Sequence, residues 1–222
     1  MLYLVPTPIG NLDDITYRAV RTLREVDLIA CEDTRTSGVL LSHYDIDTPT
    51  TAYHEHNEHD KTSHLVKRMR AGHDVAVISD AGSPGISDPG FYITRACWEA
   101  DVPVEALPGP TALLPALTAS GLPCDRFAFE GFLPKKKGRQ TRLQTLASEP
   151  RTLVLYESPH RLLRTLADLG EHMGPDRRAA VARELTKKFE EIERGTLASV
   201  REYFGSHENL KGECVIVVDG AD

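Results

Sequence analysis

The first half of the chain alternates between short apolar runs and longer stretches in which apolar residues recur at helical spacing. Runs rich in apolar and β-branched residues predict strands at 2–5, 28–31, 50–53, 75–78 and 104–107. Helices are predicted over 15–26, 34–44, 65–70 and 111–119. A further helix, which follows the 80–90 loop, is predicted to run through Trp98. This alternation predicts a mostly parallel sheet, and the uninterrupted apolar run at 75–78 predicts a strand covered on both faces.

The pattern changes after Ala119. Residues 120–123 predict a linker, and further strands are expected at 127–132, 153–156, 179–183, 189–194 and 214–218. One helix is expected over 159–172, and the basic run at 135–139 precedes another. Because few helices separate these strands, they predict a smaller sheet of mixed direction. We therefore predict two α/β domains, residues 1–119 and 120–222.

Composition places the chain among ordinary globular proteins. Hydrophobic residues make up 41% and charged residues 27% of its 222 residues. No apolar run is long enough to span a bilayer, and residues 1–6 lack the basic start of a signal peptide. The four cysteines are far apart and form no CxxC pair, which is typical of reduced thiols in a cytosol. We therefore expect a cytoplasmic protein without a membrane partner.

The net charge of −7 weighs against a nucleic-acid partner, because phosphate binding favours a basic surface. A local basic stripe can nevertheless bind phosphates on an acidic protein. Such a stripe is present at Lys135, Lys136, Lys137 and Arg139. A charge run is usually only a solvated face. The position of this one, directly after the apolar strand predicted at 127–133, favours contact with a phosphate backbone.

Three loops rich in small residues follow predicted strands, at 7–11, 80–90 and 108–112. In an open α/β sheet, ligands bind outside the carboxyl ends of the strands, and small residues let a ligand approach the backbone. The 80–90 loop contains neither GxGxxG nor the lysine of a P-loop, so the usual dinucleotide and nucleoside-triphosphate sites are excluded. Taken alone, the loop fits a long surface turn equally well.

Seven motifs along the chain have a recognisable order. They are Pro6-Thr7-Pro8-Ile9-Gly10-Asn11, Cys31-Glu32-Asp33-Thr34-Arg35, Ser79-Asp80-Ala81-Gly82-Ser83-Pro84, Pro108-Gly109-Pro110-Thr111-Ala112, Gly131-Phe132-Leu133-Pro134, Tyr156-Glu157-Ser158-Pro159-His160-Arg161 and Arg183-Glu184-Leu185-Thr186-Lys187-Lys188. In this order they resemble the small-subunit ribosomal RNA cytidine 2′-O-methyltransferase family, part of the tetrapyrrole-methylase superfamily of S-adenosylmethionine enzymes. The resemblance covers essentially the whole chain.

The resemblance implies a fold, a reaction and a set of binding residues. The fold is a mostly parallel N-terminal sheet and a smaller mixed C-terminal sheet, with the cofactor in the cleft between them, in a homodimer. The reaction is methylation of the ribose 2′-hydroxyl of a cytidine in the decoding region of 16S ribosomal RNA. The residues that it assigns to S-adenosylmethionine are Pro8, Asp80, Ser83, Ile86, Thr111, Ala112, Tyr156, Ala182 and Glu184. Family members usually continue into a small helical segment after a strand like 212–219, and this chain is expected to lack any RNA contact from that segment.

A ribose hydroxyl is a poor nucleophile unless a nearby group accepts its proton. The candidates for that general base are Glu32, Asp33 and His54, and the sequence does not choose among them. Asp33 is equally suited to cap a helix. Arg35 is a candidate RNA contact through the resemblance, or otherwise an ordinary surface residue.

Other interpretations of single motifs remain open. The histidines of residues 54–59 do not have the helical HExxH spacing, so we expect a surface loop there and no metal. Glu157 and His160 lie at a plain helix start, where Pro159 takes the first position. Arg183 and Glu184 fit an interdomain ion pair at least as well as a cofactor contact.

Two rival functions are retained. A methyltransferase for a tetrapyrrole or another small acceptor would need a large apolar cavity and no lysine run. A non-catalytic RNA-binding assembly factor would have no need of the loops at 80–90 and 108–112.

Overall fold

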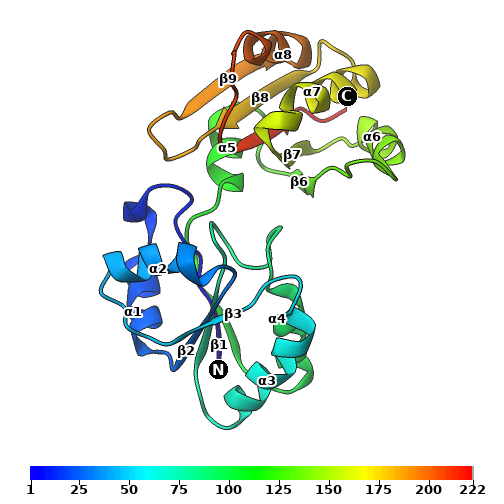
Figure 1. The fold of residues 1–222 in the computed structure, drawn as a ribbon. Coiled ribbons are helices and arrows are strands. Elements are labelled where there is room, and N and C mark those ends of the chain that lie inside the picture. Colours follow the sequence, from blue (N-terminus) through cyan, green and yellow to red (C-terminus); the bar gives the residue numbers. More distant parts are fainter. Residues whose placement is uncertain (222) are drawn as a thin grey trace. The chain divides into compact units, whose positions relative to one another are not determined.

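The computed structural model describes residues 1–221 (Figure 1). The chain divides into two compact units, one of residues Met1–Thr111 and one that begins at Ala112. Within the described residues, no helix is both long and apolar enough to cross a membrane.

The first unit is built on a fully parallel sheet in the order β3-β2-β4-β1-β5. The strands are β1 (Leu2–Leu4), β2 (Leu28–Cys31), β3 (Thr50–Ala52), β4 (Val75–Ile78) and β5 (Val104–Ala106). The helices are α1 (Tyr17–Glu25), α2 (Thr34–His43), α3 (Glu58–Arg70) and α4 (Phe91–Glu99), with a short 3-10 turn η1 (Leu12–Asp14). The predicted parallel α/β layer is confirmed.

Both faces of this sheet are covered. Ala76 and Ile78 of β4 pack into a core shared with α1 and α2, whereas Val75 and Val77 pack into a second core shared with α3 and α4. Because successive strand residues point to opposite faces, two buried faces require an uninterrupted apolar run. Figure 1 shows the two pairs of helices on opposite sides of the sheet.

The second unit contains a mixed sheet in the order β6-β7-β10-β8-β9, in which only β6 and β7 are parallel. The strands are β6 (Phe127–Phe132), β7 (Thr152–Glu157), β8 (Arg178–Arg183), β9 (Glu191–Thr196) and β10 (Cys214–Val218). The helices are α5 (Leu113–Ser120), α6 (Arg139–Ala147), α7 (Pro159–Met173) and α8 (Leu197–Gly205). As predicted, the C-terminal sheet is mixed.

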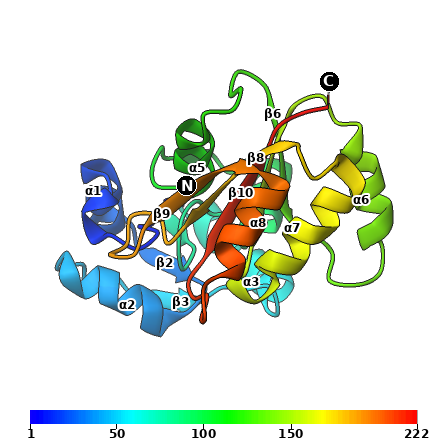
Figure 2. The ribbon, with the colours of Figure 1, turned by 90° about the horizontal axis from the view of Figure 1, so that it is seen from above.

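Helices α6, α7 and α8 lie side by side across one face of this sheet (Figure 2). Leu143, Leu166 and Phe204, one from each helix, share a core with Ile216 of β10. Helix α5 packs against β8, β9 and β10. The sheet is therefore also covered on both faces, which explains the unbroken apolar sequence of β10.

Three details differ from the sequence prediction. The unit boundary follows Thr111 rather than Ala119, because α5 packs against strands of the second unit. Helix α3 begins at Glu58, inside the stretch expected to be a surface loop, because Glu58 is buried at its first turn. Helix α8 was not predicted; it begins at a capping box in which Ser199 replaces the usual Glu or Gln, so its start signal is weak in the sequence.

Candidate active site

The loops that follow β1 and β4 join at the carboxyl edge of the first sheet. Thr7 and Gly82 exchange two backbone hydrogen bonds of 2.9 Å, and the buried Thr7 hydroxyl donates to the carbonyl of Ser79 at 3.0 Å. Gly82 has a φ of +83°, a conformation that L side chains rarely adopt. The two loops therefore form one rigid element at the end of adjacent strands.

The loop after β5 joins the same element. The Ser83 hydroxyl donates to the carbonyl of Pro110 at 3.2 Å. A Cβ added to Gly109 would lie 2.8 Å from Cβ of Pro6, so only glycine lets the β5 loop approach the β1 loop this closely. The structure thus brings together the three loops that the sequence singled out.

The 83–90 segment is a turn closed by backbone hydrogen bonds. Gly85 donates to the carbonyl of Pro89 at 3.2 Å, and Ile86 donates to the carbonyl of Ser83 at 3.2 Å. A Cβ on Gly90 would lie 2.7 Å from the backbone nitrogen of Gly85. The Ile86 side chain is exposed at the tip of this turn.

Three carboxylates gather where β2 and β4 end. The backbone N–H of Asp33 donates to Oδ1 of Asp80 at 3.1 Å. Burial, and after it the charge of Asp80, raises the pKa of Glu32. Partial burial also raises the pKa of Asp80, an effect that the Asp33 N–H partly offsets. A carboxylate with a raised pKa is a better proton acceptor near neutral pH.

Asp33 has a different environment from Glu32. It caps α2 by accepting from the backbone N–H of Arg35 at 2.8 Å, and it also pairs with the Arg35 guanidinium at 2.8 Å. These bonds lower the pKa of Asp33 to about 2. Asp33 is therefore a helix cap and a weak base, while 90% of the Arg35 side chain remains exposed.

His54 follows β3 at the same edge of the sheet. Its Nε2 lies 3.2 Å from Nδ2 of Asn57, and its buried Nδ1 has no hydrogen-bond partner among residues 1–221. A charge on His54 lowers the pKa of Glu32, so the two side chains are close enough to interact. The structure therefore places all three candidate bases at one edge and gives each a different environment.

A cavity of about 360 Å³ opens at this edge. Its lining comes from the β1 loop, from α2 and from the end of β4: Thr7, Pro8, Gly10, Leu12, Thr36, Ser37, Val39, Leu40, Ser79 and Asp80. Two predicted cofactor residues, Pro8 and Asp80, therefore share this cavity. Thr111 and Ala112 lie further along the β5 loop, where the first unit ends.

The predicted cofactor residues of the second unit lie in or directly after the sheet. The Tyr156 ring packs against Phe129 with ring centroids 4.9 Å apart, and the buried Ala182 pairs with Val215 of β10. Glu184 follows β8 with a φ of +52°. Strained backbone of this kind is often found at functional sites.

The side chain of Glu184 is already paired. It accepts from Nζ of Lys187 at 2.8 Å and from the backbone N–H of Glu213 at 3.2 Å. Arg183 pairs instead with Glu191. Arg183 and Glu184 therefore each have a charged partner within the second unit.

The basic run divides into two kinds of residue. Lys135, Lys136 and Lys137 are exposed, and no acidic side chain among the described residues pairs with them. Arg139 is only 4% exposed, and its guanidinium binds Asp168, Thr165 and the carbonyl of Pro134. This burial disfavours the predicted contact of Arg139 with RNA, and three of the five N–H groups of its guanidinium are bound by protein acceptors.

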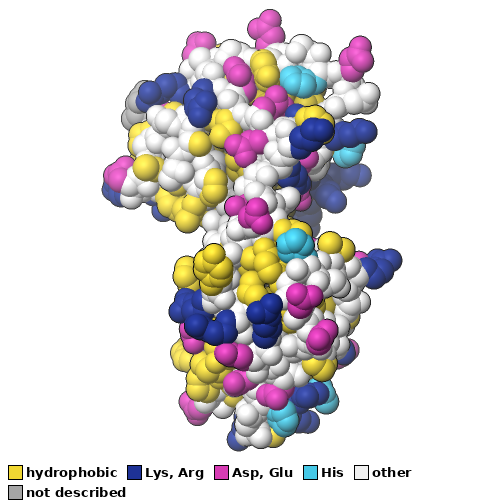
Figure 3. All heavy atoms as spheres, turned by 90° about the vertical axis from the view of Figure 1, so that its left-hand side faces the viewer, with side chains coloured by type: hydrophobic (Ala, Val, Ile, Leu, Met, Phe, Trp, Pro, Cys, Tyr) yellow, Lys and Arg dark blue, Asp and Glu magenta, His cyan; other side chains and the backbone are white. Residues whose placement is uncertain are grey.

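The face drawn in Figure 3 mixes acidic and basic side chains in each unit and carries no extended basic surface.

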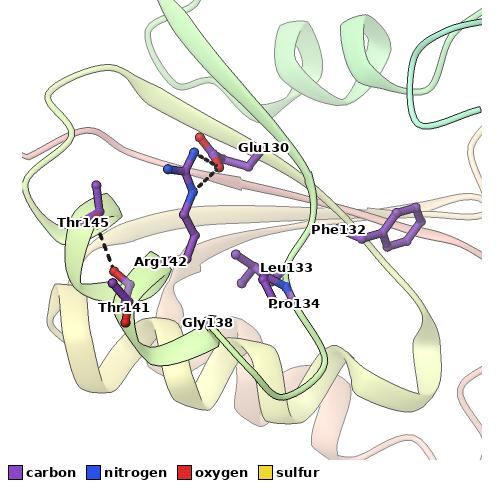
Figure 4. Close-up of a pocket in the computed structure, with 8 residues that line it drawn as sticks. All are labelled: Glu130, Phe132, Leu133, Pro134, Gly138, Thr141, Arg142 and Thr145. Carbon is purple, nitrogen blue, oxygen red and sulfur yellow. Dashed lines mark hydrogen bonds and ion pairs between the residues drawn. The ribbon is translucent and has the colours of Figure 1, made fainter. Parts of the chain in front are cut away.

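A second pocket, of about 580 Å³, lies beside the lysine run. Its lining comes from β6, from the following loop and from α6: Glu130, Phe132, Leu133, Pro134, Gly138, Thr141, Arg142 and Thr145. Figure 4 shows Glu130 and Arg142 facing each other at one side, where they form an ion pair with Nε 2.8 Å from the carboxylate. The ring of Phe132 points away from this pair.

Comparison with known proteins identifies the class. A family model described as Tetrapyrrole (Corrin/Porphyrin) Methylases matches residues 1–201. The chain therefore belongs to the tetrapyrrole methylase family. Its curated relatives define the branch, and the family predicted from the motifs is confirmed: the chain belongs with the proteins named ribosomal RNA small subunit methyltransferase I.

The relative from Synechocystis sp. is 54% identical over 222 residues, which are 100% of this chain and 79% of that protein. The Pseudomonas aeruginosa relative is 53% identical, covering 99% of this chain and 78% of that protein. The Escherichia coli O157:H7 relative is 49% identical, covering 99% and 77%.

Solved structures support the fold. Diphthine synthase matches with a TM-score of 0.76 at 12% identity, covering 98% of this chain and 89% of its own. Uroporphyrin-III C-methyltransferase from Thermus thermophilus, in a complex with S-adenyl homocysteine, matches with a TM-score of 0.66 at 23% identity, covering 97% and 96%. At these identities the likeness establishes the fold alone.

Proposed function

We propose that this chain transfers a methyl group from S-adenosylmethionine to the ribose 2′-oxygen of a cytidine in the decoding region of 16S ribosomal RNA. The observation that carries the proposal is identity of about one half, along the whole chain, to small-subunit ribosomal RNA methyltransferases. Such a reaction needs a site that binds the RNA backbone and a group that accepts the hydroxyl proton. The exposed lysines of the second unit would supply the first, and the carboxylates of the first unit would supply the second.

The strand-end loops of the first unit fit the cofactor. S-adenosylmethionine carries positive charge, and the accessible carboxylate of Asp80 at the wall of the 360 Å³ cavity is a suitable partner for it. Glycines 82 and 109 leave backbone uncovered beside it. Pro8, Asp80 and Ser83 would hold the cofactor here, and the other residues assigned by resemblance remain predictions.

When bound, the cofactor supplies a methyl group attached to a sulfonium sulfur. The rest of the cofactor, which gives up this methyl group, is a neutral thioether and a good leaving group. The protein has to orient the ribose oxygen in line with that methyl group, exclude water and accept the hydroxyl proton. We assign the proton to Glu32, because burial and the charge of Asp80 raise its pKa. The Glu32 carboxylate would accept the proton of the ribose hydroxyl.

Asp33 and His54 take supporting roles in this proposal. Asp33 caps α2 and binds Asp80 through its backbone N–H. His54 acts on Glu32 through charge, because a charge on its imidazole lowers the pKa of the Glu32 carboxyl. Arg35, whose side chain is largely exposed, would contact a phosphate of the substrate.

The lysines would bind the RNA backbone. Three exposed ammonium groups in succession would provide a local site for phosphates on a chain of net charge −7. We further propose that the chain works as a homodimer in the cytoplasm. Light scattering during size-exclusion chromatography tests the homodimer, and a monomer at working concentration would contradict it.

The direct test is a radiolabelled methyl-transfer assay on small ribosomal subunits from a strain that lacks this protein, followed by nuclease mapping. We expect label on a 2′-O-methylcytidine in the decoding region. Absence of label on subunits and free RNA, while calorimetry detects cofactor binding, would overturn the RNA substrate and favour a small acceptor. Absence of cofactor binding would favour a non-catalytic assembly factor.

A further inference from the structure

The loop that carries the lysines is held at its start by two arginines. Nη2 of Arg161 donates to the carbonyl of Leu133 at 3.2 Å, and Nη1 of Arg139 donates to the carbonyl of Pro134 at 3.2 Å. These are the two carbonyls directly before Lys135. The arginines come from α7 and from the first residue of α6, so the loop is attached to two helices.

Both arginines belong to one buried network. Glu157, which is 2% exposed, accepts from Nε and Nη2 of Arg161 at 2.7 and 2.8 Å. Asp168 accepts from Nε of Arg139 at 2.8 Å. Thr165, which is 1% exposed, joins the two halves: its hydroxyl donates to Glu157 at 2.7 Å and accepts from Nη2 of Arg139 at 2.9 Å.

Such a network is costly unless every member is satisfied. Buried ion pairs contribute little net stability compared with apolar packing, but a satisfied network has one well-defined geometry. Here the apolar core of the unit, with Leu162, Leu166 and Leu169 on the same helix, already stabilises α7. What the charged groups add is a fixed position for the loop backbone.

We propose that Arg139, Arg161 and their buried partners Glu157, Thr165 and Asp168 are positioning residues for RNA. They hold the 133–138 loop in one conformation, so that the ammonium groups of Lys135, Lys136 and Lys137 meet the RNA backbone already arranged. Binding then avoids the entropic cost of ordering the loop. This inference rests on the proposed RNA-binding role of the lysines.

Thr165 offers a matched pair of variants. Thr165→Val keeps the volume and removes the hydroxyl that links Arg139 to Glu157, whereas Thr165→Ser keeps the hydroxyl. With small ribosomal subunits from a strain lacking this protein, at fixed salt, we expect the valine variant to bind about tenfold more weakly, equivalent to about 1.4 kcal/mol. The serine variant should bind like the wild type. The KM for subunits should rise in the valine variant while kcat and the cofactor dissociation constant stay unchanged.

A double-mutant cycle separates positioning from general damage. In a chain carrying Lys135→Ala, Lys136→Ala and Lys137→Ala, the loop has no ammonium groups left to arrange. Thr165→Val should therefore cause little further loss of RNA affinity in that background. An equal loss in both backgrounds, or no loss in the wild-type background, would overturn the inference.

Two further measurements keep the test independent of folding and of catalysis. Hydrogen exchange at residues 133–138 should be faster in Thr165→Val than in Thr165→Ser. Leu169→Ala, a buried change on the same helix, should lower the melting temperature without affecting RNA affinity. A comparable loss of RNA affinity in this variant would show that the network acts only through the stability of the fold, which would overturn the inference. If the wild type binds subunits but does not methylate them, the proposed function fails while the positioning result stands.

Discussion

The two functional regions of this chain are built from different parts of the polypeptide. At the carboxyl edge of the first sheet, backbone groups and short hydroxyl side chains join the loops: Thr7 and Gly82 bond through their backbones, and the Ser83 hydroxyl bonds to the carbonyl of Pro110. At the lysine loop of the second unit, the long charged side chains of Arg139 and Arg161 hold the backbone.

The difference has a physical reason. A small cationic ligand that approaches the backbone closely needs bare peptide groups, which glycine-rich turns provide. A polyanionic strand needs separate charges at set positions, and these require side chains anchored from below. The first region should therefore be sensitive to any added Cβ, and the second to loss of particular polar atoms.

The largest expected effect is on chemistry at the first region. Glu32→Gln removes the proposed proton acceptor, so kcat should fall about 100-fold or more, as is usual for loss of a general base. Cofactor affinity should remain unchanged. In the wild type, kcat should rise with pH through the raised pKa of Glu32 and then level off, because only the ionised carboxylate accepts a proton.

The control for this change is Glu55→Gln, which removes an exposed carboxylate that affects Glu32 only through its charge. It should retain kcat, while the rising limb of the pH profile moves to lower pH because the charge of Glu55 helps to raise the pKa of Glu32. A Glu32→Gln enzyme with wild-type kcat would remove Glu32 from the mechanism and direct attention to His54.

The next effect tests whether the first region depends on backbone approach. Gly109→Ala places a Cβ 2.8 Å from Pro6, so the loops must separate, with a loss of about 1–3 kcal/mol in unfolding free energy. Cofactor affinity, measured by calorimetry, should fall with it. Gly38→Ala is the matched control, because nothing lies within 4 Å of its added Cβ. Equal losses of stability and of cofactor affinity in the two variants would show that the first region does not depend on close backbone approach.

The third prediction concerns the lysines. Replacing Lys135, Lys136 and Lys137 with alanine should weaken RNA binding and reduce the slope of log K against log salt by about 2, since each phosphate contact on a single strand contributes about 0.7. Cofactor binding should be intact. Replacing Lys67, Arg68 and Arg70 on α3 removes the same charge elsewhere, and an equal change in slope there would show that net charge alone matters.

The smallest effect is expected at Asp33. Asp33→Asn keeps a good helix-capping side chain and loses only the charge, so kcat should change by no more than a few-fold. The pKa of about 2 already makes Asp33 a poor proton acceptor. A loss as large as that of Glu32→Gln would reverse the assignment of the base.

Much of the fold was predictable because buried parallel strands have a distinctive sequence. The strands at 28–31, 75–78, 127–132 and 214–218 were predicted with the bounds that the structure has. Helix α8 was missed, since its apolar residues Leu197, Val200 and Phe204 are mixed with polar ones and its cap is unusual. Helix α5 was predicted but placed in the wrong domain, because the sequence does not say which sheet it covers.

The candidate site was predictable to a similar degree. The three loops of the first unit were identified from their small residues and their position after strands, and the structure joins them. The burial of Arg139 was not predictable because, in the sequence, it is one more cation in a basic run. Its acceptors Thr165 and Asp168 lie 26 and 29 residues away.

The sequence by itself determined the family, the parallel first sheet and mixed second sheet, and the loops proposed to bind the cofactor, because these depend on local composition and on the order of motifs. The tertiary structure decided which carboxylate has a raised pKa and which cations of the basic run are exposed. Both properties depend on burial and on partners in the folded chain: burial and then the charge of Asp80 raise the pKa of Glu32, Arg35 lowers that of Asp33, and Arg139 is buried against Asp168 and Thr165 of α7.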